Sequence, residues 1–498
     1  MPPKIPPIND YHRPRWLFWA LILCFAVGML RVLPVLLHTP LIALANSYDE
    51  VRYSACFDLY PDRPVEISPM LNSPEAPYSH YAFRQTEQPI CYWSTEWIGQ
   101  AAAATFFKIQ HAVSGQTSFS VRWLGLSKFA VFMLVWLFFT IEWWRRGPPA
   151  LTLANGLLFP LLLCDPANTV YLNTFYAEFT AVVTLYLMIC VILVYHERPK
   201  SVHAMVLLTL AAFALGMSKI QHLLLPMMCA ATVLLFDYAK THRSSWRATA
   251  LFVGAFAALL VQLAQLHRDN AAMRDIDMFN RADVAFTGLL PNASDPQKTA
   301  DILELDHDCL RYAGLRAWQL PGYPPQVCSS IANVSRGREL NALLHDPLMG
   351  VRLFAGGVAA LNPWLAPGLG IVEGGHFAPL PPWMPTASDA FAASAIVRAI
   401  LLGGPVVAMF VLLFWRRRPS GMRRYTVLTV AVMFTTLTVT VLGDGLADVP
   451  KQGHLVINAA FAWWIYMLTI ALARLMGMHT SSTQQRISAA VNPVNLKQ

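Results

Sequence analysis

Long apolar runs separated by short polar segments make up most of the chain. A transmembrane helix needs about 20 predominantly apolar residues to cross about 30 Å of hydrocarbon, and ten runs reach or approach that length. The runs near 148–164 and 202–236 are the shortest, so their ends are the least defined. The pattern predicts transmembrane helices at residues 16–37, 124–143, 148–164, 175–195, 202–218, 220–236, 247–266, 396–415, 425–442 and 456–476.

The composition agrees with this pattern and excludes other classes of protein. Of the 498 residues, 55% are hydrophobic and only 13% are charged, against about 25% charged in soluble globular proteins. Disordered, fibrous and soluble chains do not have this balance, and the basic residues do not cluster as nucleic-acid binding requires. We therefore expect an all-α polytopic membrane protein that contacts membrane lipids and binds no nucleic acid.

Membrane topology explains the excess of basic residues. The chain carries 37 Lys and Arg against 29 Asp and Glu, a formal net charge of +8. Cytoplasmic segments of membrane proteins are enriched in Lys and Arg, and all segments on one side are basic if the N-terminus is cytoplasmic. Ten spans then return the C-terminus to the cytoplasm. The basic residues that support this orientation are Lys4, Arg13, Arg15, Arg145, Arg146, Arg198, Lys200, Lys240, Arg243, Arg247, Arg416, Arg417, Arg418, Arg423, Arg424, Arg474, Arg486 and Lys497.

This topology divides the chain into segments and leaves two large extracytoplasmic loops, at residues 38–123 and 267–395. Within the first loop, residues 94–112 have the pattern of a helix that is too polar to span, with an aromatic face (Trp97, Phe106 and Phe107), and we expect it to lie along the membrane surface. The predicted organisation is a cytoplasmic N-terminus at 1–15, the first two spans with their loop at 16–143, spans three to seven at 144–266, the second loop at 267–395, spans eight to ten at 396–476 and a cytoplasmic tail at 477–498.

The eight cysteines divide in the same way. Four lie in or near predicted spans, where cysteine ordinarily serves as a small apolar residue. Cys56 and Cys91 share the first loop, and Cys309 and Cys328 share the second. One even pair in each loop on the oxidising side of a membrane predicts one disulfide per loop. Two pairs of free thiols are the alternative.

Ionisable residues near membrane depth are costly, which makes them functional candidates. Asp49 and Glu50 lie where the chain leaves the first span, followed by Arg52. Adjacent carboxylates repel, so one has a raised pKa unless Arg52 or a cation compensates. The pair suits a general base, a metal ligand or both, and a solvated turn is the alternative. Arg31, late in the first span, either serves the same site or extends its charged end to the interface.

The order of these features resembles a known family. Arg31 in the first span is followed by the Asp-Glu pair, the surface helix and Arg122 at the start of the second span. Lys219 follows a serine between two later spans, and a Leu-rich helix with Pro226 comes next. This arrangement resembles the GT-C superfamily of integral-membrane glycosyltransferases, and the Ser-Lys turn is similar to that of the mannosyltransferase and aminoarabinose-transferase branches. The second large loop contains no motif that matches it to a particular branch of the superfamily.

The resemblance implies transfer of a sugar from a polyprenyl-phosphate donor to a glycan, lipid or protein acceptor at the outer face of the membrane. It implies a bacterial inner membrane with the active site on the periplasmic side. By resemblance, Asp49 is the first candidate for the catalytic base and Glu50 the second, while Lys219 stabilises the departing phosphate. Some relatives by resemblance use a divalent cation, Mg²⁺ or Mn²⁺, and Asp49 and Glu50 are then its ligands. No other cofactor is expected.

Other polar residues at the same boundary are candidates for binding sugar or acceptor. Glu178 lies just inside an apolar helix and needs a partner there, so it either lines the site or bonds another helix. Lys451 and His454 lie in the turn before the last span and either face Asp49 or form a solvated turn. The complete set of predicted substrate-binding residues is Lys219, Arg31, Arg52, Arg122, Glu178, Tyr176, Asn173, Arg84, His222, Lys451 and His454.

Two other functions fit the composition. A transporter or flippase of lipid-linked sugars would ordinarily show repeated halves with broken helices, and the sequence shows no such repeat. A polysaccharide polymerase or ligase would use Arg and His residues of the second loop, and Asp49 would then be dispensable.

Overall fold

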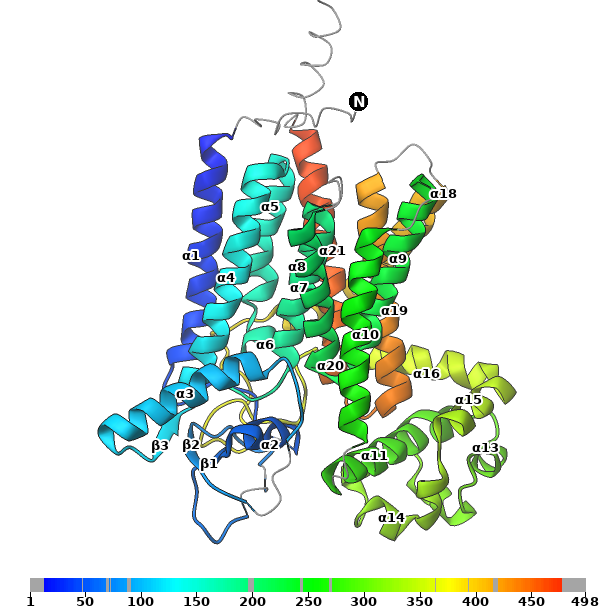
Figure 1. Cartoon of the computed structure of the whole chain (residues 1–498). Helices are drawn as coiled ribbons and strands as arrows, with labels where there is room; N and C mark the ends of the chain where they lie inside the picture. The colour runs from blue at the N-terminus through cyan, green and yellow to red at the C-terminus, as the bar shows by residue number, and fades with distance from the viewer. Residues whose placement is uncertain are drawn as a thin grey trace, which may run out of the picture.

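The structure is a computed structural model of the chain. It describes residues 13–476 apart from 47, 69–70, 72, 87–90, 196–200, 242–244, 268–270, 363, 393 and 415–419. Most of the long helices run side by side in one bundle, and two groups of smaller elements lie at the end of the bundle away from the N-terminus, which we call the far end (Figure 1). The predicted tail at 477–498, most of the predicted segment at 1–15 and the basic residues Arg198, Lys200, Arg243, Arg416, Arg417 and Arg418 lie outside the described residues.

The chain is a mostly helical integral membrane protein. Among the described residues, seven helical stretches are long and apolar enough to cross a membrane, and shorter apolar helices occupy the other three predicted runs. The long ones are α1 (Arg15–Leu37), α4 (Arg122–Arg146), the stretch Ile220–Ala239 that contains η3 (Ile220–His222) and most of α9 (Leu224–Thr241), α10 (Trp246–Leu266), α18 (Ala395–Phe414), α19 (Ser420–Asp444) and α21 (His454–Leu475). The shorter ones are α5 (Pro149–Leu158) with η2 (Phe159–Leu163), α7 (Glu178–Val194) and α8 (Val202–Ser218).

Aromatic rings and small residues together determine how these helices pack. The rings of Trp136 in α4 and Phe159 in η2 stack with their centroids 4.3 Å apart in the buried core. A Cβ atom at Gly254 of α10 would collide with the carbonyl oxygen of Thr209 in α8, so only glycine permits this close approach. Small residues at helix contacts are typical of membrane bundles, where dispersion contacts between closely approaching backbones provide much of the packing energy.

The segment between α1 and α4 contains a small sheet, which the all-α prediction missed. It holds α2 (Tyr48–Ser54), η1 (Ala55–Phe57), β1 (Leu59–Pro61), β2 (His80–Phe83), α3 (Trp97–Ser114) and β3 (Ser118–Ser120). The strands form an antiparallel sheet in the order β1-β2-β3, with Tyr60 opposite Ala82 and Tyr81 opposite Phe119. The all-α prediction was wrong here because strands of three or four residues are too short to show an alternating pattern.

Helix α3 corresponds to the helix predicted at 94–112 and lies across the far end of the bundle (Figure 1). Its exposed large apolar residues are Ile98, Phe106, Ile109 and Val113, whereas Phe107 is buried in a cluster that includes residues of the sheet. The predicted aromatic face is therefore divided, because Phe107 turns inward to stack on Phe119 with the ring centroids 4.9 Å apart.

The segment between α10 and α18 is a group of short helices followed by an extended stretch. The extended stretch returns to the chain that leaves α1: the amide nitrogens of Ala43 and Ala45 donate to the carbonyl oxygens of Ile371 and Gly370 at 3.0 and 2.8 Å. Two parts of the chain more than three hundred residues apart are thereby joined. The helical elements are α11 (Ala271–Asp283), η4 (Val284–Leu289), α12 (Leu290–Asn292), α13 (Pro296–Leu303), η5 (His307–Tyr312), η6 (Ala317–Gln319), α14 (Pro324–Val327), η7 (Ser329–Asn333), α15 (Arg336–His345), α16 (Pro347–Ala360) and α17 (Ala387–Ala392), and α6 (Pro166–Thr169) and α20 (Val449–Gln452) lie in turns of the bundle.

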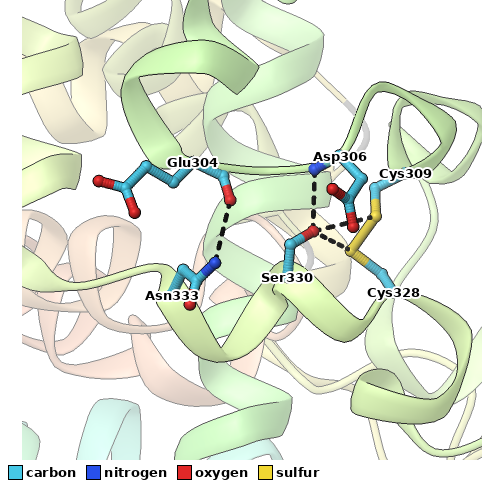
Figure 2. The surroundings of a disulfide bond; sticks show 6 residues. All are labelled: Glu304, Asp306, Cys309, Cys328, Ser330 and Asn333. Carbon is cyan, nitrogen blue, oxygen red and sulfur yellow. Dashed lines mark hydrogen bonds between the residues drawn. A yellow bond between two sulfur atoms is a disulfide. The ribbon is translucent and has the colours of Figure 1, made fainter.

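Both predicted disulfides are present, Cys56–Cys91 and Cys309–Cys328. The second connects η5 to the start of η7, and the hydroxyl of Ser330 lies 3.6 Å from each sulfur while it accepts from the amide of Asp306 at 2.8 Å (Figure 2). The four remaining cysteines are free and buried. Both half-cystines are buried in the hydrophobic cluster of this group of short helices, which the disulfide cross-links.

Replacing both Cys309 and Cys328 with alanine should lower the free energy of unfolding of this group by about 3 kcal/mol, because the cross-link restricts a loop in the unfolded chain. Limited proteolysis in detergent, analysed for cleavage between α11 and α17, measures the effect. A reducing agent should produce the same susceptibility in the unmodified protein and no further change in the double variant. Equal protection of the variant would contradict the prediction.

Candidate functional site

A cluster of opposite charges lies where α2 meets α20, at the far end of the bundle (Figure 1). The Nζ of Lys451 lies 2.5 Å from an Oδ of Asp49 and 2.7 Å from an Oδ of Asp448. The other Oδ of Asp49 accepts from Arg52 at 2.7 Å. The side chain of Lys451 is 6% exposed and that of Asp49 is 20% exposed, so the ammonium is enclosed and the Asp49 side chain is partly exposed.

Local sequence places these groups with little freedom. Asp49 and Arg52 are three residues apart on one turn of α2, and Asp448 and Lys451 have the same spacing at α20. Residues separated by three or four positions face each other on a helix, so each pair forms within its own element. The contact between Lys451 and Asp49 then joins the two elements.

A second ion pair lies beside the first. Lys219 follows the end of α8 in an extended conformation and contacts the carboxylate of Glu178, the first residue of α7. Both side chains are almost fully buried. His454 lies between the two pairs, with Nδ1 2.8 Å from the carbonyl oxygen of Lys451 and Nε2 3.2 Å from that of Glu178.

Aromatic and histidine side chains enclose the cluster. The ammonium of Lys451 lies 5.3 Å from the centroid of the Tyr176 ring, a cation–π contact, and the hydroxyl of Tyr176 donates to the carbonyl oxygen of Ala45 at 3.2 Å. The imidazole of His222 lies 6.4 Å from that of His454 and bonds to the hydroxyl of Ser218 at 2.8 Å. The structure thus brings together eight of the predicted site residues, namely Asp49, Arg52, Tyr176, Glu178, Lys219, His222, Lys451 and His454.

The charges around Asp49 determine its protonation. Burial alone would raise the pKa of Asp49, but the positive charges of Arg52, Lys451 and Lys219 hold that pKa well below its usual range. Conversely, Asp448 and Asp49 raise the pKa of the Lys451 ammonium above its usual range, against the opposing effect of burial. Asp49 is therefore an ionised carboxylate neutralised by neighbouring cations.

Glu50 has a different environment from Asp49. Its carboxylate accepts from the hydroxyl of Tyr81 at 3.1 Å, and the same hydroxyl accepts from the amide of Asn46 at 3.1 Å. Burial raises the pKa of Glu50 to about 8, although the charge of Lys128 and the Tyr81 hydrogen bond oppose the shift. The sequence predicted a raised pKa for one of the two adjacent acids, and the environment of Glu50 agrees with this prediction. The principal cause of the raised pKa is burial of Glu50, not repulsion by Asp49.

The divalent cation that some relatives use does not fit these residues. Both oxygens of Asp49 face cationic side chains, and Glu50 contacts Tyr81 instead of sharing a position with Asp49. A magnesium or manganese site needs several oxygen ligands directed at one point. Within the described part of the chain, no group of three or more His, Cys, Asp or Glu side chains could hold a metal ion.

Four predicted residues have their hydrogen-bond partners outside the cluster. Arg31 pairs with Asp165 at 2.7 Å in the turn before α6, and the amide of Asn173 donates to the carbonyl oxygen of Val35 at 2.8 Å. Arg122 donates to the carbonyl oxygen of His38, at 2.6 Å, and Arg84 donates to that of Arg63. These contacts hold turns and loop ends in place, so the positions of the four residues favour structural roles.

Sequence reasoning missed a third buried ion pair, between Lys128 of α4 and Glu96 at the start of α3. Lys128 also donates to the carbonyl oxygens of Thr174 at 2.5 Å and Tyr176 at 3.2 Å, which fixes the turn before α7. Burial raises the pKa of Glu96 to about 7 despite the neighbouring Lys128. The available signal was the single lysine within the apolar run 124–143, which requires a partner.

Comparison with known proteins identifies a family. Residues 20–329 match the YfdI N-terminal transmembrane domain. The chain belongs to this family. No curated protein matches the chain. The YfdI domain contributes Asp49, Glu178 and Lys219 to the cluster, whereas Lys451 and His454 lie beyond the matched residues. The charged cluster is therefore completed by residues outside the family domain.

Replacing Lys128 with methionine should lower the free energy of unfolding by about 3–5 kcal/mol, because Glu96 is left buried without its charged partner. Thermal unfolding in detergent measures the change. The double variant Lys128→Met/Glu96→Leu should recover part of the loss, since it removes both charges. A double variant less stable than Lys128→Met would contradict the ion-pair explanation.

Glu50 should make stability depend on pH. A carboxyl whose pKa rises from 4.5 to about 8 on folding stabilises the protein fully below its unfolded pKa and loses this effect as the pH rises through 8. Glu50→Gln should therefore reduce the fall in unfolding temperature between pH 5 and 8. Thermal unfolding over this range tests the effect, with Glu66→Gln, at an exposed position, as the control. An unchanged slope in Glu50→Gln would show that Glu50 is not the titrating group.

Proposed function

We propose that this protein is a GT-C-like membrane glycosyltransferase that moves a sugar from a polyprenyl-phosphate donor to a glycan, lipid or protein acceptor. The observation that carries the proposal is the carboxylate of Asp49, on a partly exposed side chain, held between Lys451 and Arg52 with Lys219 close enough to lower its pKa. A reaction that removes a proton from one substrate and leaves charge on a phosphate requires this combination of groups. Membership of the YfdI family supports a membrane glycosyltransferase.

The proposed topology has ten spans, with both termini in the cytoplasm. Three short apolar helices of the bundle then cross the membrane together with the seven long stretches. The two large segments, at 38–123 and 267–395, lie outside, which places the cluster at the outer boundary. We assign the protein to a bacterial inner membrane, with the site on the periplasmic side.

In the proposed reaction, the acceptor oxygen attacks the anomeric carbon of the sugar. Asp49 takes the proton of the acceptor hydroxyl, and the bond between the anomeric carbon and the phosphate oxygen breaks. Its electron pair remains on the lipid phosphate, where Lys451, Arg52 and Lys219 balance the new negative charge. Glu178 holds Lys219 in position, and the ring of Tyr176 supports Lys451.

The resting ion pairs provide a way to activate the base only when donor is bound. Arg52, Lys451 and Lys219 lower the pKa of Asp49 and make it a weak base. A phosphate that contacts Lys451 and Arg52 adds negative charge beside Asp49 and competes for the same donors. Both effects raise the pKa of Asp49 toward the value that proton abstraction needs.

Asp49→Asn should reduce sugar transfer by about 10²–10⁴-fold because it removes the general base. Lys451→Met and Lys219→Ala should each reduce transfer by about 10²–10³-fold, the range found when one charge-stabilising group is removed. The assay uses purified protein in nanodiscs with a panel of radiolabelled polyprenyl-phosphate hexoses and pentoses. Asp301→Asn is the matched control. This acid is exposed on α13 of the second segment, and the variant should retain full transfer.

The same assay separates the competing functions. Unimpaired transfer by Asp49→Asn would contradict the mechanism and favour a polymerase or ligase that uses the second segment. Movement of labelled donor across the bilayer without glycosidic product would instead favour a flippase.

A further inference from the structure

An apolar ridge runs along α15 and α16. Leu340 and Leu344 of α15 are 58% and 69% exposed, and Leu348, Val351 and Val358 of α16 are 52%, 65% and 44% exposed. Their spacing of three, four or seven residues places the residues within each helix on one face. A contiguous apolar face of this kind is rarely left in water, because soluble surfaces seldom expose large apolar patches.

Helix α16, which carries three of the ridge residues, lies against a membrane-spanning helix. The ring of Phe354 in α16 stacks on Phe434 of α19, with centroids 6.0 Å apart and an angle of 14° between the rings. A Cβ atom at Gly357 would lie 2.6 Å from Val441 of α19, so α16 crosses α19 closely at this glycine. Phe434 is 60% exposed within the apolar window of α19. The exposed surface of α16 is therefore continuous with the surface that α19 presents to lipid.

The orientation of α16 matches that of a helix lying in a membrane surface. Figure 1 shows α16 running across the direction of α19 near the far end of the bundle, with α3 across the opposite side of the bundle at the same end. The polar contacts of α16 are made with its own segment: Arg352 donates to the carbonyl oxygen of Asn292 and to Ser294, at 3.1 and 3.2 Å.

We propose that the apolar ridge of α15 and α16 is embedded in the acyl and headgroup boundary of the membrane, and that lipid is its partner. We choose lipid as the partner because the exposed surface of α16 is continuous with the lipid-facing surface of α19. An amphipathic helix binds at that boundary with its apolar face toward the acyl chains and its polar side toward water. The inference concerns an interaction surface and does not depend on the chemistry proposed for Asp49.

Anchoring of this ridge in the membrane also stabilises the position of the cluster of charges. Leu446, between α19 and α20, lies 3.0 Å from where a Cβ atom at Gly356 would be, and its amide donates to the hydroxyl of Thr287 at 2.8 Å. The turn that leads to Lys451 is thus held between α16 and η4. Lipid contact along α16 stabilises the segment against which this turn packs.

A fluorescence-quenching experiment tests the proposal in the full-length protein. Leu344→Cys and Val351→Cys are labelled with a polarity-sensitive maleimide and reconstituted in nanodiscs of phosphatidylcholine and phosphatidylglycerol with doxyl-labelled phosphatidylcholine. Leu30→Cys, 72% exposed on α1, is the lipid-facing reference, and Gln297→Cys, exposed on α13, is the aqueous reference. The unmodified protein measures background labelling of native cysteines.

Both ridge probes should be quenched about as strongly as the Leu30 probe, and their emission should be shifted to shorter wavelength than that of the Gln297 probe. Quenching no greater than at Gln297 would overturn the proposal. Disulfide cross-linking between two copies through Val351→Cys, without quenching by lipid, would also overturn it and identify a second copy as the partner. Leu348→Cys provides a third ridge position if one labelled variant does not fold.

Discussion

The structure depends on neutralising charges that lie at the boundary of a membrane-spanning bundle. A charge there keeps little of its hydration, and its cost is offset only when an opposite charge and hydrogen bonds replace the water. Lys451 meets this condition with Asp49 and Asp448, and Lys219 meets it with Glu178. The ends of the helices that carry these residues must therefore converge, whatever path the intervening chain takes.

This requirement links function to stability at the same residues. Three cations lower the pKa of Asp49, and in the proposed reaction the same cations bind the phosphate. Lys128 and Glu96 form a comparable pair behind the cluster, where Lys128 holds the turn that contains Tyr176. In the reaction proposed above, substrate partly replaces the ion pairs that pre-organise this site, and its binding is thereby coupled to the protonation of Asp49.

Contacts of the second large segment hold both chain stretches that lead into the cluster. The stretch near Ile371 pairs with the chain that leaves α1, just before Asp49, and Thr287 of η4 bonds to the turn before Lys451. Helix α3 and the proposed lipid contacts of α16 lie on opposite sides of the bundle at this end (Figure 1). The short helices and the three-stranded sheet are thereby fixed by their own buried clusters, by disulfides and by contacts with the bundle.

The sequence by itself determined the ten helical runs, the position of α3 and the two disulfides, because apolar length, amphipathic spacing and even cysteine counts are properties of contiguous segments. It also selected Asp49, Lys219, Glu178 and Lys451, since charges are scarce near the apolar runs. Only the tertiary structure decided how these charges pair. Lys451 meets Asp49 across 402 residues of sequence, and no local pattern encodes which distant charge will neutralise another. For the same reason Arg31 was expected near the cluster, although its guanidinium is neutralised by Asp165.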